Sequence, residues 1–161
     1  MHRLDIVGVR VELPSKQPIV LLKEVGGERY LPIWIGAVEA TAIAFAQEGI
    51  TTARPMTHDL MRDVLRALRT ELTRVTITDL QDGVFFATLV FGNGVEVSAR
   101  PSDAIALAMR MGAPVYGEEA VLAEAGITVP EEQEQERESE LEKFREFLDT
   151  ISPEDFNTPG S

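Results

Sequence analysis

The chain has 161 residues, the length of one domain or of one domain with an appendage, and 44% of them are hydrophobic, which is typical of a globular protein and excludes a disordered one. It contains no cysteine, so a disulfide framework, a thiol nucleophile and a thiolate zinc site are excluded. No apolar run approaches the ~20 residues that span a bilayer, and the N-terminal residues do not form a signal peptide. The sequence therefore predicts a cytoplasmic protein without a membrane segment.

The net charge of −12 is concentrated near the C-terminus. Residues 131–161 carry 11 acidic and 3 basic side chains, whereas residues 1–130 carry 16 acidic and 12 basic ones. This balance argues against non-specific coating of nucleic acid or membrane by the whole surface. It leaves room for a local basic patch or for a metal ion bound by carboxylates.

Short runs rich in β-branched and aromatic residues predict strands along most of the first 116 residues. Gly-Gly at 26–27, Asp-Gly at 82–83 and Asn-Gly at 93–94 separate such runs and favour tight hairpin turns. Pro32 predicts an edge or a bulge in its strand, because proline cannot donate to the ladder. Apolar residues on both faces of 84–91 predict a central strand covered on both sides. The predicted strands are residues 6–13, 19–25, 29–35, 75–80, 84–91, 95–99 and 113–116.

Apolar residues at helical spacing predict four helices in the same part of the chain. The first is small and apolar nearly all round, which predicts that it is buried. The second is expected to bury a face formed by Met61, Val64, Leu65, Leu68 and Leu72. The predicted helices are residues 39–47, residues 57 to about 72, a helix that opens after Pro101 and runs to residue 110, and residues 118–125.

These elements predict an α+β fold with a largely antiparallel or mixed sheet, built from hairpins with short helices packed on it. We expect one domain over residues 1–130, followed by an acidic tail over residues 131–161. An apolar stripe in the tail predicts an amphipathic helix at about 137–151. The stripe consists of Leu141, Phe144, Leu148 and Ile151. Such a helix needs a surface, which is provided by its own domain, by a neighbouring chain or by another protein.

Acidic residues stand at three predicted helix starts, and two of these starts follow the tripeptide Ala-Arg-Pro, at 53–55 and 99–101. The acids are Glu39, Asp59 and Asp103. One interpretation is helix capping, because Ser, Thr and Asp accept hydrogen bonds from free backbone N–H groups and acids favour the positive helix end. The other is a convergent cluster that binds Mg²⁺ or Mn²⁺, with His58 nearby.

Arginines also allow two interpretations. Three of them share one face of the second helix, namely Arg62, Arg66 and Arg69. This face is either merely solvated or a ridge that contacts phosphates. Arg54 and Arg100 precede helix starts and would add to the ridge, because a guanidinium matches phosphate oxygens in a bidentate way. Their alternative role is to pair with Asp59 and Asp103.

Common catalytic signatures do not occur in the sequence. There is no Gly-rich phosphate loop, no serine nucleophile elbow and no histidine pair at metal-binding spacing. Trp34 could stack a nucleobase. A single tryptophan in an apolar strand is, however, more often a core residue.

Three motifs follow one another along the chain. They are Leu31-Pro-Ile-Trp-Ile-Gly36 with Glu39-Ala40, then Arg54-Pro55 with Thr57-His-Asp-Leu60, and then Arg100-Pro-Ser-Asp-Ala-Ile-Ala-Leu-Ala108. In these motifs, in their order and in their approximate spacing, the sequence resembles the bifunctional nuclease (BFN) domain family. The resemblance covers roughly Val7 to Gly126. It implies an α+β domain that self-associates and, as reported for some members, nuclease activity on both DNA and RNA.

The leading hypothesis is a divalent-metal-dependent nuclease that hydrolyses phosphodiester bonds of DNA, RNA or both and forms a homo-oligomer. Glu39, Asp59 and Asp103 would hold Mg²⁺ or Mn²⁺ and, with His58 as a ligand or proton shuttle, form the catalytic group. Arg54 and Arg100 would bind the scissile phosphate. The helical arginines Arg62, Arg66 and Arg69 would position the strand.

The alternative is a non-catalytic oligomeric module for regulation or assembly. A nuclease needs acids that arginines do not pair and that are open to water. An assembly module would have Arg54 and Arg100 locked onto Asp59 and Asp103 in buried pairs. A third possibility is the binding of a small anion or nucleotide at the helix N-termini, against which the acids already there would count.

Overall fold

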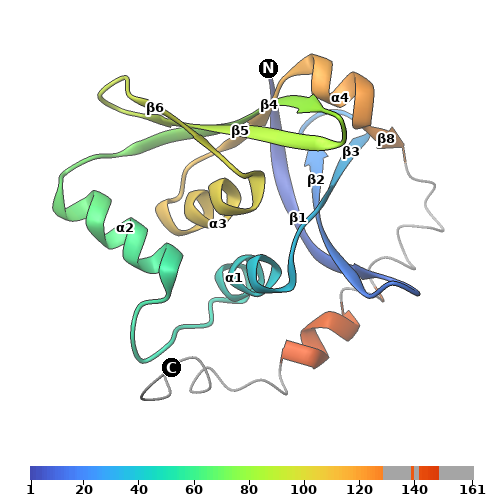
Figure 1. The fold of residues 1–161 in the computed structure, drawn as a ribbon, viewed down its shortest axis with the longest axis horizontal. Coiled ribbons are helices and arrows are strands. Elements are labelled where there is room, and N and C mark those ends of the chain that lie inside the picture. Colours follow the sequence, from blue (N-terminus) through green and yellow to red (C-terminus); the bar gives the residue numbers. More distant parts are fainter. Residues whose placement is uncertain (129–138, 140–141, 149–161) are drawn as a thin grey trace.

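An eight-stranded sheet bends around two helices in the centre of the protein (Figure 1). The computed structural model describes residues 1–128, 139 and 142–148. The strands are β1 (His2–Glu12), β2 (Gln17–Glu24), β3 (Arg29–Trp34), β4 (Leu72–Gln81), β5 (Val84–Phe91), β6 (Glu96–Ala99), β7 (Val115–Gly117) and β8 (Ile127–Thr128). Their order is β6-β5-β4-β7-β1-β2-β3-β8, and all neighbours are antiparallel except β4 and β7. The predicted α+β fold with a mixed sheet is confirmed.

Helices α1 and α3 supply much of the core. The helices are α1 (Ala37–Glu48), α2 (Thr57–Ala67), α3 (Pro101–Met111) and α4 (Glu119–Ala125). α1 and α3 contact each other and the sheet, and residues 104–108 of α3 are all buried. Small side chains such as Ala40 and Ala104 let the two helices approach closely while Ile43 and Ile105 fill the space beside them.

Tight turns join strands where the sequence predicts them. Asp82 and Gly83 have φ of 51° and 78° between the paired ends of β4 and β5, as a two-residue turn with matching twist requires. Pro32 pairs with Leu21 of β2, whereas β8 pairs only with the first two residues of β3. Pro32 therefore lies beside an open edge, as predicted. Strand β8 was not predicted.

Helix α2 ends earlier than predicted, and its predicted core face is only partly buried. Met61 and Leu65 pack against the core, and Leu72 is buried in β4. The helix stops at Ala67, Arg69 has a φ of 55°, and Leu72 already begins β4. His58 is the buried residue of α2, whereas Val64 is 47% and Leu68 69% exposed. The helix contacts α3 on one side. The spacing of apolar residues shows which of them share a face, but it does not show whether another layer covers that face.

Strand β5 is not covered on both faces, contrary to the prediction. Ala87, Leu89 and Phe91 are buried, and helix α3 contacts β5. Val84 and Phe86 are exposed. The strand lies one place from the sheet edge, and in the described part of the chain only one of its faces is packed closely.

The described part of the predicted tail helix packs on its own domain. Residues 142–148 are helical, and Phe144 and Leu148 are buried as part of the main core. Arg145 Nε forms an ion pair with Glu48 Oε1 of α1 at 2.7 Å. Leu141 and Ile151, like most of the predicted acidic tail, lie outside the described residues. Within the described ranges, no helix is long and apolar enough to cross a membrane.

Candidate functional site

Three helix starts converge on one exposed arginine. Arg100 precedes α3, its Nη1 donates to Glu39 Oε1 in the first turn of α1 at 2.8 Å, and its Nε donates to Asp103 Oδ2 at 2.9 Å. His58 Nε2, from the first turn of α2, lies 2.9 Å from Asp103 Oδ1. We call Glu39, His58, Arg100 and Asp103 the Arg100 cluster. The predicted meeting of helix starts therefore occurs, with a guanidinium between two of the acids.

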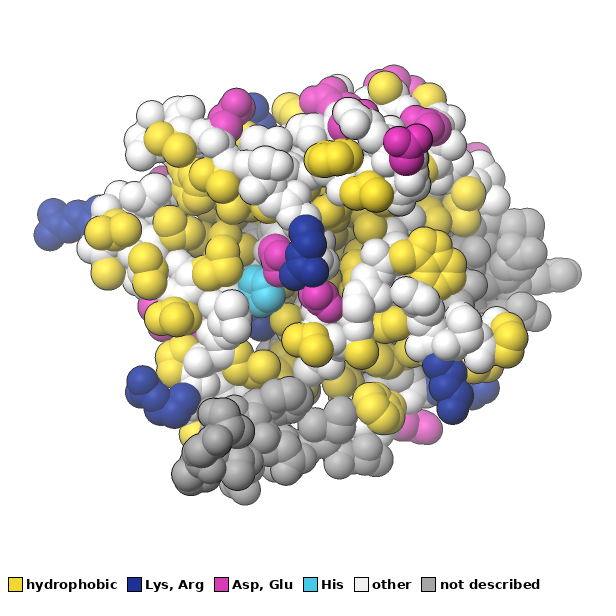
Figure 2. Space-filling model, in the orientation of Figure 1, with side chains coloured by type: hydrophobic (Ala, Val, Ile, Leu, Met, Phe, Trp, Pro, Cys, Tyr) yellow, Lys and Arg dark blue, Asp and Glu magenta, His cyan; other side chains and the backbone are white. Residues whose placement is uncertain are grey.

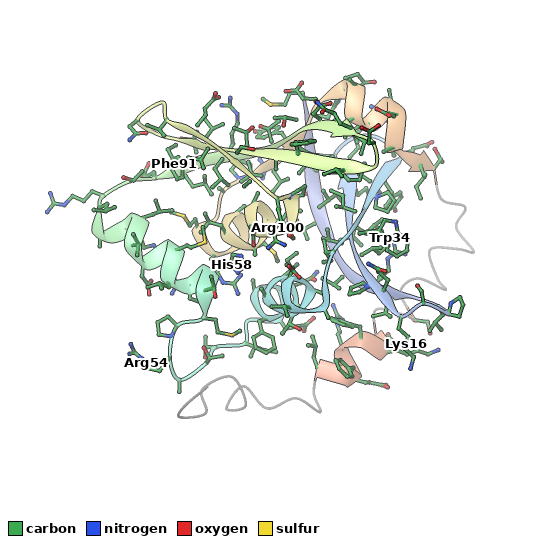
Figure 3. All side chains as sticks on the ribbon, in the orientation of Figure 1. Lys16, Trp34, Arg54, His58, Phe91 and Arg100 are labelled. Carbon is green, nitrogen blue, oxygen red and sulfur yellow. The ribbon has the colours of Figure 1, made fainter. Side chains whose placement is uncertain are left out.

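The Arg100 cluster opens to solvent through its arginine. The Arg100 side chain is 63% exposed, Asp103 and Glu39 are partly exposed, and His58 is nearly buried. Figure 2 shows the charged groups at the centre of one face, with the imidazole beside them and hydrophobic side chains around. Figure 3 places Arg100 and His58 next to each other on this face. Water and a ligand can therefore reach Arg100 directly.

Electrostatics favour the charged forms of Asp103 and Arg100. Partial burial alone would raise the pKa of the Asp103 carboxyl, but hydrogen bonds from Arg100 and His58 hold this pKa below its usual value. Hydrogen bonds to Asp103 and Glu39 raise the pKa of Arg100. Because the Asp103 carboxylate can only accept, the proton in the shared hydrogen bond belongs to His58 Nε2. In a neutral ring, Nδ1 is then the atom that can accept a proton.

Asp59 does not join the cluster. Its Oδ1 accepts a hydrogen bond from Arg110 Nε at 2.7 Å, and its Oδ2 accepts one from the Met56 backbone N–H at 3.1 Å. Arg110 is only 6% exposed and also donates to the carbonyls of Ala42 and Ala106 at 2.9 Å. Burial would raise the Asp59 pKa, but the bonds from Arg110 and Met56 lower it. The Asp59–Arg110 pair therefore links α2 to α1 and α3.

The capping interpretation fits one acid better than the others. Asp59 satisfies the backbone N–H of the residue that precedes α2. At α1 and α3, the N-cap residues Gly36 and Arg100 make no side-chain capping bond, and the nearby acids bind the Arg100 guanidinium instead. Sequence reasoning missed Arg110. Its signal was a single arginine in the last turn of an otherwise apolar helix.

The other predicted arginines lie away from the cluster. Arg62 pairs with Asp63 at 3.0 Å and approaches Asp59 at 3.9 Å. Arg66 and Arg69 line a hollow of about 540 Å³ around the end of α2. Eleven helical residues place that end about 15 Å from the His58 end. Figure 3 shows Arg54 on the loop before α2, away from Arg100.

A cavity adjoins the cluster on the side of β3. It measures about 380 Å³ and lies between the β3–α1 junction, the β4–β5 turn and the start of α3. Its lining includes Trp34, Phe85 and Arg100. Trp34 is 55% exposed, so its interpretation as a core residue is wrong. Its neighbours Ile33 and Ile35 are buried, and strand alternation turns Trp34 to the other side.

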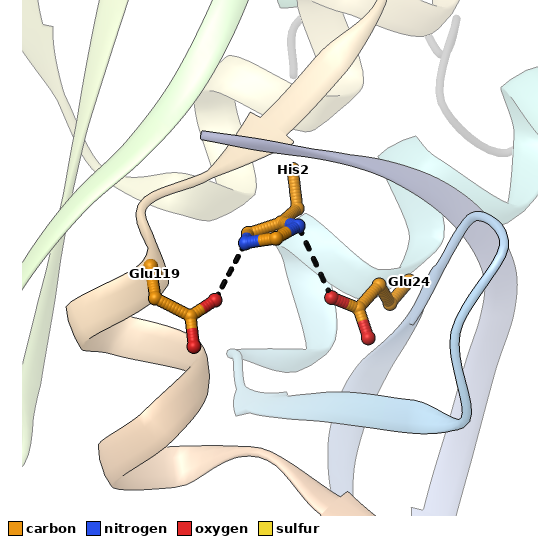
Figure 4. A group of neighbouring side chains, drawn as sticks. All are labelled: His2, Glu24 and Glu119. Atoms are coloured by element: carbon orange, nitrogen blue, oxygen red, sulfur yellow. Dashed lines mark ion pairs between the residues drawn. The ribbon is translucent and has the colours of Figure 1, made fainter.

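A second charged group joins β1, β2, β3 and α4 (Figure 4). His2 Nδ1 lies 3.3 Å from Glu24 Oε2, and His2 Nε2 lies 2.5 Å from Glu119 Oε2. Arg29 donates to both carboxylates, at 2.7 Å to Glu24 and 2.9 Å to Glu119. The hydrogen bond from Arg29 lowers the pKa of Glu119 to about 2. Sequence reasoning did not identify this group, whose members lie far apart in the chain.

The geometry does not assemble the predicted three-acid metal site. Among the described residues, the group of three potential ligands whose atoms all lie within 4.8 Å of one another is formed by His2, Glu24 and Glu119. Arg110 holds Asp59 apart from the other two acids, and Arg100 bridges Glu39 and Asp103. Each acid of the predicted metal site is therefore paired with an arginine, which the nuclease hypothesis did not expect. Arg100 pairs with Asp103, as the assembly hypothesis expected, but this pair is exposed and not buried.

The sequence profile described as the bifunctional nuclease domain matches residues 20–130 of the chain. The chain belongs to the bifunctional nuclease domain family. Its relatives include two proteins from Mycobacterium tuberculosis, of strain H37Rv and of strain CDC 1551, each named as an uncharacterized protein. Each is 54% identical to this chain over 161 residues, and the match covers 97% of this chain and 98% of the relative. The matched range contains the whole Arg100 cluster.

Proposed function

We propose that the chain is a nuclease that hydrolyses phosphodiester bonds of DNA, RNA or both at the Arg100 cluster. The observation that carries this proposal is the exposed Arg100 guanidinium, held 2.8–2.9 Å from two carboxylates and next to a histidine–aspartate pair. A guanidinium of this kind can bind two phosphate oxygens at once. Membership of the bifunctional nuclease domain family supports a nuclease-related function.

Each residue of the cluster has a role in the proposed reaction. Arg100 binds the non-bridging oxygens of the scissile phosphate and offsets the charge that develops on them. His58 takes a proton from the attacking water or returns one to the leaving oxygen, since imidazole is suited to proton transfer near neutral pH. Asp103 fixes the orientation of the His58 ring. Glu39 holds Arg100 in place from α1.

A divalent cation fits the cluster only in part. Glu39 and Asp103 are the residues that would hold Mg²⁺ or Mn²⁺, because hard cations prefer carboxylate oxygens. This requires Arg100 to turn from the carboxylates towards the phosphate, which its exposure permits. Asp59 would not take part, because Arg110 binds it. When bound, the cation would add positive charge beside the phosphate.

The remaining predicted arginines would guide the nucleic acid on either side of the cluster. Arg62 and Arg66 follow α2 away from His58, Arg69 lies just beyond the end of that helix, and Arg54 lies on the loop before it. We propose that they contact backbone phosphates outside the scissile one. Such contacts contribute affinity without sequence preference and weaken as salt rises.

Cleavage of end-labelled DNA and RNA, with and without Mn²⁺, tests the proposal. Changing His58 to alanine should lower the rate by about 10²–10⁴-fold, the usual contribution of general acid–base catalysis. Asp5→Asn is the matched control, because Asp5 is an exposed acid on β1 outside the cluster. If all variants cleave like the wild type, or if chromatography separates the activity from the protein, the proposal fails.

Self-association of the chain as an oligomeric assembly module is the second candidate. The observation that favours it is the apolar side of α2, where Leu60, Val64 and Leu68 are exposed. A monomer rarely leaves such side chains together in water. We propose that a second copy of the chain covers them.

Sedimentation of the wild type and of Val64→Glu tests this second candidate. A loss of mass in a folded variant supports the interface. The absence of any oligomer in the wild type contradicts it. Cleavage by a folded, monomeric Val64→Glu variant would show that nuclease activity does not need assembly.

A further inference from the structure

We propose that the cavity beside Arg100 binds an unpaired nucleobase stacked on Trp34, so that the substrate is single-stranded nucleic acid or an unpaired segment. This inference rests on the proposed function and narrows it to a substrate class. The cavity has the mixed lining of a site for a flat, polar-edged ring. Its lining includes Trp34, Val84, Phe85, Gln17, Ser102 and Arg100. Its volume of about 380 Å³ lies at the lower end of the range for small-ligand pockets.

Trp34 provides the stacking surface. More than half of the side chain is exposed although it lies in an apolar strand between two buried isoleucines. It is also held firmly, because β3 pairs with β2 along Trp34 and the chain enters α1 directly afterwards. A rigid, exposed indole binds any base through its face, which gives affinity with little sequence preference.

Arg100 connects the base site to the phosphate site. The same residue lines the cavity and bridges Glu39 and Asp103. A phosphate bound by Arg100 would therefore place the sugar and base of a neighbouring nucleotide at the mouth of the cavity. Figure 3 shows Trp34 and Arg100 on the same face of the protein.

Base pairing disfavours entry into the cavity. Inside a duplex, a base is stacked on both faces and hydrogen-bonded at its edge, so that its face cannot reach Trp34 without leaving the helix. In a single strand, turning one base away from its neighbours costs little free energy. A neighbouring protein chain could also cover Trp34, but a purely protein-binding hot spot would not need to share Arg100 with a phosphate-binding group.

Fluorescence gives a direct test because Trp34 is the one tryptophan in the sequence. The full chain is titrated with a short single-stranded oligothymidylate that carries non-hydrolysable phosphorothioate links, and separately with the matching duplex. We expect strong quenching by the single strand and little by the duplex. No quenching by either probe, or equal quenching by both, overturns the proposal.

Anisotropy of the labelled oligonucleotide gives the second readout. Trp34→Leu should weaken single-strand binding by about 5- to 150-fold, the range expected for the loss of one stacked base. Trp34→Phe should restore much of it, and duplex binding should change little. The matched control is Phe147→Leu, since Phe147 is 56% exposed but lies on the C-terminal helix.

The two proposals fail in different ways. Quenching and Trp34-dependent binding without cleavage would support the nucleobase site and contradict the proposed nuclease activity. If the wild type cleaves nucleic acid and Trp34→Leu binds the single strand as tightly as the wild type, the nuclease proposal stands and the nucleobase site is refuted. A fall in sedimenting mass for Trp34→Leu, without a change in oligonucleotide affinity, would assign Trp34 to an interface between chains and also refute the base site.

Discussion

Substituting asparagine for Asp59 and for Asp103, one at a time, separates a structural acid from a functional one. Both acids stand in the first turn of a helix, and both pair with an arginine. The arginines differ in exposure, because Arg110 is 6% and Arg100 63% exposed. We expect Asp59→Asn to reduce stability and Asp103→Asn to abolish cleavage.

The expected loss of stability follows from the burial of each arginine. Removing one partner of a buried ion pair costs about 3–5 kcal/mol. Asp59 is 23% exposed, so water weakens the pair, and we expect Asp59→Asn to lower the free energy of unfolding by about 2–3 kcal/mol. Solvent screens the Asp103–Arg100 pair, and a surface pair contributes about 1 kcal/mol or less.

Thermal unfolding and cleavage are measured on the same preparations. In a chain of this size, 1 kcal/mol shifts Tm by about 2–4 °C, so Asp59→Asn should lower Tm by about 4–12 °C and Asp103→Asn by about 4 °C at most. Asp59→Asn should still cleave at temperatures where it is folded. Equal stability losses, with cleavage falling only in proportion to the unfolded fraction, would refute the functional role of Asp103.

Three further predictions follow from the contacts. A Cβ at Gly36 would lie 2.3 Å from Glu39 Oε2, so Gly36→Ala should slow cleavage several-fold at temperatures where the variant is folded. Unchanged kinetics would show that the position of Glu39 does not matter. Arg29 lowers the pKa of Glu119 to about 2 from a usual value of 4.5. The free energy of unfolding should therefore fall as the pH drops from 4.5 towards 2. The same dependence of the free energy of unfolding on pH in Glu119→Gln would contradict this prediction. Calorimetry should detect Mn²⁺ binding by the wild type and by Asp59→Asn but not by Asp103→Asn. Binding that Asp59→Asn loses and Asp103→Asn keeps would show that Asp59 is a metal ligand.

The fold was predictable where local signals are strong. Dipeptides such as Asp-Gly at 82–83 require backbone conformations that only a few residues adopt, and the turn formed there as predicted. The exposure of α2 and of the outer face of β5 was not predictable. Spacing reveals which residues share a face, whereas coverage depends on where the sheet order places that face, and β5 lies beside the edge strand.

The site was predictable to the level of helix starts but not of partners. The Ala-Arg-Pro repeats suggested that Arg54 and Arg100 play matching roles. In the structure Arg100 bridges Glu39 and Asp103, while the acid after the first repeat, Asp59, binds Arg110 from the far end of α3. Arg110 lies 51 positions from Asp59, so no local sequence pattern connects the two residues. The sequence therefore shows the acid but not the arginine that pairs with it.

Two groups of similar composition show what distinguishes a ligand site from a structural link. The Arg100 cluster and the group around His2 each contain a histidine, two carboxylates and an arginine. Arg29 is 28% exposed and engages both of its acids while joining three strands to α4, so releasing it would cost interactions between several elements. Arg100 is more than twice as exposed and borders a cavity, so a phosphate can reach its guanidinium from solvent. The exposure of the arginine, and not the number of acids, is therefore the feature that favours the Arg100 cluster as the proposed binding site.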